Sequence, residues 1–135
     1  MARTLTTADR LAIHELIGLY GHLIDQRAFA RLHEIFTPDA VFDLTGYGGD
    51  IYHGLEAIIE LMEQSHEHPL AHHATNIVVE KVIGETARVI SKGLGVGHQG
   101  RVGSVVYRDE LLNNNGVWRI RSRAVSLRSR EDTQS

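Results

Sequence analysis

The chain has 135 residues, of which 42% are hydrophobic and 23% charged, and these values are typical of one globular domain with a substantial core. A formal net charge of −3 argues against nucleic acid or an anionic membrane surface as a partner. The absence of cysteine excludes disulfides and cysteine-bound metals. No stretch reaches the roughly 18 apolar residues of a membrane span or contains a signal-peptide core, so we expect a single cytoplasmic domain over residues 1–135.

Three segments predict helices. The first runs from about Ala8 to Arg27, follows a threonine cap and repeats apolar residues at three- and four-residue spacing. The second covers about Ala28–Phe36 and is stopped by Pro38, because proline disfavours helical geometry in the residue before it. The third covers about Leu55–Ser65, beyond a glycine-rich loop.

The remaining segments predict strands. A strand is expected at Ala40–Leu44 and a short extended piece at Ile51–His53. The longer strands expected after them are Ala71–Lys81, Thr86–Gln99, Arg101–Leu112 and Val117–Leu127. Three helices followed by a mainly antiparallel sheet predict an α+β fold, with the helices on one face of the sheet.

Two adjacent histidines, His72 and His73, begin the first long strand. Neighbouring side chains of a strand point to opposite faces, so one imidazole can face the interior while the other faces away. On this pattern His72 shares a face with Ala74 and Asn76, and His73 shares the other with Ile77. The interior histidine is a candidate catalytic base.

An acidic residue near the end of the first helix could orient that base. Asp25 lies beside the apolar stripe, and a buried carboxylate needs a partner. A histidine is such a partner: the carboxylate accepts the proton of one ring nitrogen and leaves the other as a base. Tyr20, five positions earlier, could donate a hydrogen bond to a substrate oxygen. In the alternative reading, Asp25 caps the helix or pairs with Arg27 or Arg31, and the histidine is an ordinary core residue.

Two further patterns suggest ligands but have simpler explanations. Gly95–Gly100 matches the dinucleotide fingerprint GxGxxG, yet the residues after it predict a strand, not the helix that the motif requires, so the glycines are more typical of bends. The cluster His66, His68, His72 and His73 lacks metal-binding spacing, and we expect no metal there.

The last predicted strand carries arginines at alternate positions. Arg119, Arg121 and Arg123 would form a solvated outer face paired with acidic neighbours, because interleaved aromatics for nucleic acid are absent. Tyr47 and Tyr52 flank the glycine-rich loop Gly46–Gly49, where they could line the mouth of a cavity.

Several short motifs together resemble one family. In order, these are Asp9-Arg10-Leu11-Ala12-Ile13, Tyr20, Asp25, Ile35-Phe36-Thr37-Pro38-Asp39-Ala40, His53-Gly54-Leu55-Glu56-Ala57-Ile58, His72-His73-Ala74-Thr75-Asn76, Tyr107-Arg108-Asp109-Glu110 and Gly116-Val117-Trp118-Arg119-Ile120. Their order and spacing, from about residue 8 to 125, resemble the SnoaL-like branch of the nuclear transport factor 2-like superfamily.

That resemblance implies a cone of three helices on a curved sheet around a mostly apolar cavity. Catalytic members such as scytalone dehydratase, hexachlorocyclohexane dehydrochlorinase and bile-acid dehydratase are cofactor-free lyases with an Asp–His pair, in some members with a tyrosine. Asp25 and Tyr20 match the aspartate and tyrosine. Alignment on Thr75-Asn76 favours His72 for the histidine, and a register shift of one residue would select His73 instead.

The resemblance therefore implies a dehydratase-like lyase that acts on a small hydrophobic cyclic substrate without a cofactor. The same cavity could instead serve an isomerase, a polyketide-cyclase-like enzyme or a non-catalytic module for ligand binding or dimerisation. Relatives commonly form dimers or trimers through the sheet, so a homo-oligomer is expected.

Overall fold

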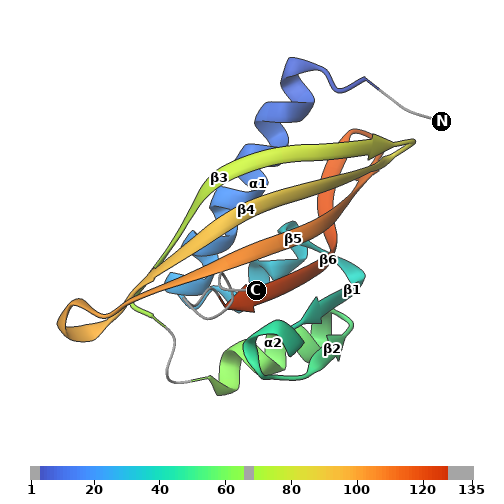
Figure 1. Ribbon diagram of the computed structural model, residues 1–135. Helices are drawn as coiled ribbons and strands as arrows, with labels where there is room; N and C mark the ends of the chain where they lie inside the picture. The colour runs from blue at the N-terminus through green and yellow to red at the C-terminus, as the bar shows by residue number, and fades with distance from the viewer. Residues whose placement is uncertain (1–3, 66–68, 128–135) are drawn as a thin grey trace.

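The structure is a computed structural model that describes residues 4–65 and 69–127, and its elements are labelled in Figure 1. In chain order they are α1 (Thr7–Asp25), the 3₁₀ helix η1 (Phe29–Glu34), β1 (Phe36–Asp43), the 3₁₀ helix η2 (Thr45–Tyr47), β2 (Ile51–His53), α2 (Leu55–Gln64), β3 (Ala71–Ile83), β4 (Thr86–Val96), the 3₁₀ helix η3 (His98–Gly100), β5 (Val102–Asn114) and β6 (Val117–Leu127).

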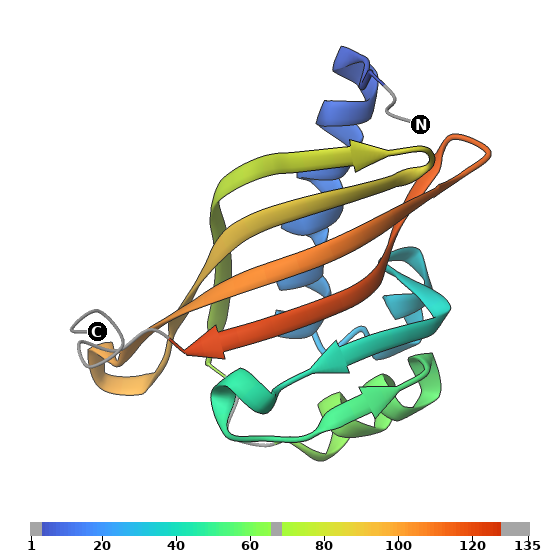
Figure 2. The same ribbon diagram turned by 45° about the vertical axis from the view of Figure 1, so that its right-hand side comes forward.

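A curved sheet is the centre of the molecule, and it confirms the predicted α+β class. Within the described residues it has six strands in the order β2-β1-β6-β5-β4-β3, all neighbours antiparallel except β1 and β6. Helix α1 lies against one face, called here the inner face (Figure 2), and α2 packs beside β1 and β2. No helix in the described part of the chain is long and apolar enough to cross a membrane.

Helix α1 begins at a capping box. Thr6 accepts a hydrogen bond from the backbone of Asp9 while the Asp9 carboxylate accepts one from the backbone of Thr6, each at 3.0 Å. The other Asp9 oxygen accepts a hydrogen bond from the indole of Trp118 on β6, at 3.2 Å. This contact holds the start of α1 against β6. Further along, α1 packs on β3.

The second predicted helix is shorter and tighter than expected. Phe29–Glu34 forms the 3₁₀ helix η1, and β1 begins at Phe36 instead of Ala40. The sheet competes for these residues: the amide of Ile120 on β6 donates to the carbonyl of Ile35 at 2.7 Å. The helix predicted over about Ala28–Phe36 is therefore present only as the 3₁₀ helix Phe29–Glu34, and its predicted end at Phe36 was wrong, because pairing with β6 outweighs the local helical pattern there.

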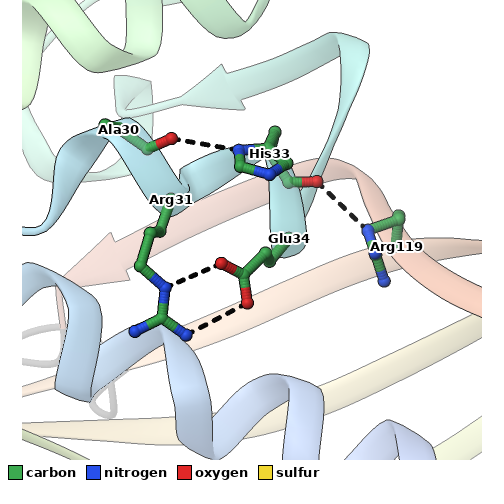
Figure 3. A network of polar contacts seen from close by, with 5 residues as sticks. All are labelled: Ala30, Arg31, His33, Glu34 and Arg119. Carbon is green, nitrogen blue, oxygen red and sulfur yellow. Dashed lines mark hydrogen bonds and ion pairs between the residues drawn. The ribbon is translucent and has the colours of Figure 1, made fainter.

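Polar contacts stabilise η1 internally and join it to β6 (Figure 3). Arg31 and Glu34 form a two-point ion pair at 2.7 and 3.1 Å, and the guanidinium of Arg119 donates to the carbonyl of His33 at 3.2 Å. Arg31 therefore pairs with Glu34 and not with Asp25.

β-Bulges reverse which residues face inward, among them one in β3 and one in β6. In β3 the pairing shifts between Thr75 and Val78, around Asn76 at φ 54°, so that Ile77 packs on the core while Val78 is exposed. Ile77 therefore joins the inner face of His72, contrary to the predicted alternation. In β6 Glu110 opposes Ser122 but Leu111 opposes Ile120, so Arg121 is the extra residue.

The bulge in β6 corrects the prediction for its arginines. Arg121 pairs with Glu110 as expected, its Nε lying 2.9 Å from the carboxylate. Arg123 does not share this face: it points inward and is 1% exposed, because the extra residue shifts the alternation by one position.

Candidate active site

A pocket of about 380 Å³ opens between the inner face of the sheet, the second half of α1 and the end of α2. Most of the side chains around it are apolar, and the polar ones are a few tyrosines, a serine and a histidine. The lining residues are Tyr20, Ile24, Phe42, Leu44, Tyr47, Leu61, Met62, Ser65, Pro69, His72, Gly93, Gly95, Gly103, Val105, Tyr107, Val125 and Leu127. An apolar cleft with few polar groups is typical of sites for small organic molecules.

Asp25 and His72 meet at the wall of this pocket. His72 Nδ1 lies 2.6 Å from Asp25 Oδ1, and the His72 amide donates to both carboxylate oxygens at 3.1 and 3.0 Å. The side chains are only 16% and 24% exposed, so water weakens their contact less than on an open surface. Because a carboxylate only accepts hydrogen bonds, Nδ1 must carry the proton, and in the neutral ring the lone pair is then on Nε2.

The other two predicted site residues are placed differently. Tyr20 is 6% exposed and lines the pocket together with His72. His73 is exposed, lies on the opposite face of β3 and does not line the pocket. The geometry therefore brings together Asp25, His72 and Tyr20 and leaves His73 outside.

A glycine on α1 allows the Asp25–His72 contact. A Cβ at Gly21 would lie 2.6 Å from the carbonyl oxygen of His72, so helix and strand touch backbone to backbone there. Asp25 is one helical turn further on the same face, and this close approach places its carboxylate over His72.

Replacing Gly21 with alanine should therefore destabilise the protein, contrary to the usual preference of helices for alanine over glycine. Replacing glycine with alanine in a helix interior ordinarily raises the free energy of unfolding by about 0.5–1 kcal/mol. We expect Gly18→Ala, where an added Cβ has no described atom within 4 Å, to stabilise the protein by about that amount. Gly21→Ala should destabilise it instead, measured by urea unfolding. Equal stabilisation by both substitutions would contradict the close packing of α1 on β3.

A buried cation lies against two of the tyrosines that line the pocket. The Arg123 guanidinium is 4.4 Å from the ring centre of Tyr20 and 3.9 Å from that of Tyr107. It forms two hydrogen bonds with Asp109, at 2.8 and 2.9 Å, and both side chains are fully shielded. Its Nη1 has no hydrogen-bond partner among the described residues. This cluster holds the two tyrosine rings edge-to-face, 6.0 Å apart.

Burial determines the protonation of this cluster. It raises the pKa of the Tyr20 phenol well above its usual 10, and it raises that of Tyr107 in the same direction. Burial opposes the charged form of Arg123, but the Asp109 carboxylate outweighs it and raises the arginine pKa above its ordinary value. Near neutral pH the two phenols are therefore uncharged donors beside a permanent cation.

The sequence reading missed three of these residues. Tyr107 and Asp109 share the inner face of β5 with Leu111, and that alternation was a usable signal. The sequence carried no such signal for Arg123. If β5 and β6 paired without a bulge from the Asn113–Gly116 turn onward, Asp109 would oppose Ser122 instead of Arg123.

The other sequence patterns have structural roles or lie elsewhere. The GxGxxG stretch forms the end of β4 and η3, and β5 follows it, so the helix required for nucleotide binding is missing there. Tyr47 lines the pocket and is 55% exposed, whereas Tyr52 packs against the core. Among the described residues no three His, Asp or Glu side chains form a metal-ligand group, and His66 and His68 lie outside those residues.

Comparison with known structures defines the class of protein. A Nostoc punctiforme protein with a cystatin-like fold superposes with a TM-score of 0.83, covering 95% of this chain and 97% of that one at 20% identity. The chain therefore has a cystatin-like α+β fold with a pocket on the inner face of its sheet. The SnoaL-like domain model matches residues 5–124, and the chain belongs to that family, as the sequence motifs predicted.

Two kinds of relative illustrate the family. The gamma-hexachlorocyclohexane dehydrochlorinase of Sphingobium indicum is 29% identical over 124 residues, covering 86% of this chain and 78% of that protein. An uncharacterised protein of Mycobacterium tuberculosis is 48% identical, but over only 42 residues. That match covers 31% of this chain and 29% of the mycobacterial protein, so it spans less than a third of the relative's length.

Proposed function

We propose that this chain is a cofactor-independent lyase of the dehydratase type, which eliminates water from a small hydrophobic cyclic substrate. The observation that carries the proposal is the 2.6 Å contact between His72 Nδ1 and Asp25 at the wall of an apolar pocket. A carboxylate on one ring nitrogen favours the tautomer in which the other can act as a base.

The proposed reaction starts with proton abstraction. Nε2 of His72 takes a proton from a carbon next to an activating carbonyl, and the negative charge of Asp25 stabilises the imidazolium that forms. The electron pair of the C–H bond becomes the new C=C bond, and the C–O bond to the adjacent hydroxyl breaks. The imidazolium returns its proton to the departing oxygen, so water leaves and His72 is again neutral.

Tyr20 supports this reaction as a hydrogen-bond donor. Its raised pKa makes the phenol a poor proton source, so we assign the proton of the leaving water to His72. The Tyr20 hydroxyl polarises the substrate carbonyl instead, and the adjacent Arg123 cation favours negative charge developing there. Arg123 acts through the tyrosines and is a positioning residue.

The comparisons support an elimination. The name of the Sphingobium indicum relative describes loss of hydrogen chloride from a chlorinated ring, and such a reaction also needs a base for the ring proton. In the proposed dehydration, a hydroxyl group that leaves as water takes the place of the chloride, and His72 is the base.

A panel of β-hydroxy cyclic ketones tests the proposal. We expect the wild-type protein to convert at least one of them to its enone, detected by mass spectrometry as loss of one water and by new absorbance of the conjugated product. His72→Gln should react no faster than buffer. Isomerised products of unchanged mass would indicate an isomerase, and a panel that binds without reacting would indicate a ligand-binding module; either result contradicts the lyase.

A further inference from the structure

An arginine stands at a backbone position that is usually glycine at the end of a helix. After α1, the amide of Arg27 donates to the carbonyl of Ile24 at 3.0 Å. The next amide, that of Ala28, donates to the carbonyl of Leu23 at 2.9 Å. These two hydrogen bonds form a Schellman motif, in which the residue at the place of Arg27 has left-handed backbone, here with φ 53°. Glycine adopts that conformation without strain and arginine does not, so we expect its side chain to have a role that outweighs the strain.

The side chain of Arg27 reaches the end of another helix. Its guanidinium donates to the carbonyl of Glu63 at 3.1 Å and to that of Ser65 at 3.5 Å, at the C-terminal end of α2. The last turn of α2 contains no basic residue of its own, and the free carbonyls of a helix end attract a cation. The ring centre of Phe29 lies 4.9 Å from the guanidinium carbon and helps to hold it in place.

These contacts join two walls of the pocket. Asp25, two residues before Arg27, holds His72 at one wall. At the other wall, three residues of α2 line the pocket: Leu61, Met62 and Ser65. Helix α2 itself packs on η1, β1 and β2, and none of these elements carries Asp25 or His72. Arg27 therefore ties the last turn of α2 to the helix end that carries Asp25.

We propose that Arg27 is a strap that keeps the pocket closed around its ligand. By binding the end of α2, it holds the apolar wall of Leu61 and Met62 near Asp25. Without the strap this wall moves outward, and an apolar ligand loses contacts on one side. Arg27 does not itself line the pocket, so it is a positioning residue. The inference concerns binding and holds whether or not the ligand loses water, so its failure and a failure of the proposed function are separate results.

The distance between the two helices tests the strap without a ligand. The chain has no cysteine, so His22→Cys with Glu60→Cys places one spin label on an exposed position of each helix. Double electron–electron resonance should then give one narrow distance distribution. Adding Arg27→Gly should at least double its width, and Arg27→Lys, which keeps a charged donor, should give an intermediate width. Because glycine suits the left-handed backbone, Arg27→Gly should fold, with a urea midpoint within about 0.5 M of the wild-type value.

The uncharged fluorescent probe N-phenyl-1-naphthylamine measures the effect on binding. It has no charge for the guanidinium to attract, and Arg27→Gly should weaken its affinity at least fivefold. The matched control is Asn115→Gly, because Asn115 also has left-handed backbone, with φ 55°, but lies in the β5–β6 turn outside the pocket. It should leave the distance distribution unchanged and alter the affinity less than twofold. An unchanged width or an unchanged affinity in Arg27→Gly, or equal effects of Asn115→Gly, would overturn the proposal.

Discussion

Replacing Asp25 with asparagine is expected to lower kcat for water loss by about 10²–10⁴-fold, the usual contribution of a positioned base. Asparagine keeps the shape and can still accept the His72 amide, so the free energy of unfolding should change by only about 1 kcal/mol. It removes the negative charge that stabilises the imidazolium, and its NH₂ group can stabilise the wrong tautomer. Steady-state kinetics on the best substrate of the ketone panel measure the effect.

The matched control is His73→Ala, which removes the neighbouring imidazole from the opposite face of the same strand. Its kcat should stay within twofold of the wild-type value. Equal losses in the two variants would indicate a general disturbance of β3, and full activity of Asp25→Asn would remove the aspartate from the mechanism.

Arg123→Met should reduce the free energy of unfolding by about 3–5 kcal/mol, the cost of leaving one member of a buried ion pair alone. The Asp109 carboxylate would remain fully shielded without its cation, and the tyrosine rings would lose the charge between them. Urea unfolding followed by the fluorescence of Trp118, the single tryptophan, measures the loss.

The double variant Arg123→Met with Asp109→Leu separates the charge from the packing. Replacing both members of a buried pair by apolar residues is often nearly neutral, so at least half of the lost stability should return. A double variant as unstable as the sum of both single variants would show that the two side chains contribute independently, and would contradict the assignment of the lost stability to an unpaired carboxylate.

The sequence predicted well where local pattern and tertiary contact agree. Helix α1 and the β5–β6 hairpin follow apolar periodicity and turn residues, which are local signals. The proximity of Asp25 and His72 was also predictable, because an aspartate beside an apolar stripe needs a partner and the family motifs supplied one.

The errors arise where a single extra residue changes the face of a strand. Asn76 places Ile77 inward and Arg121 places Arg123 inward, and neither residue type marks a bulge in advance. The segment Phe29–Phe36 departs from its predicted helix for another reason. Its conformation depends on pairing with β6, which lies more than 80 residues away in the chain.

The central claim is that Asp25 holds His72 as a neutral base, with the proton on Nδ1 and the lone pair on Nε2. Nitrogen-15 NMR of the histidine rings tests this without any substrate, with His72 assigned by comparison with His72→Gln. In mildly alkaline buffer we predict a protonated Nδ1 and an unprotonated Nε2 for His72, and loss of this preference in Asp25→Asn. A His72 ring that carries its proton on Nε2 in the wild-type protein would contradict the account.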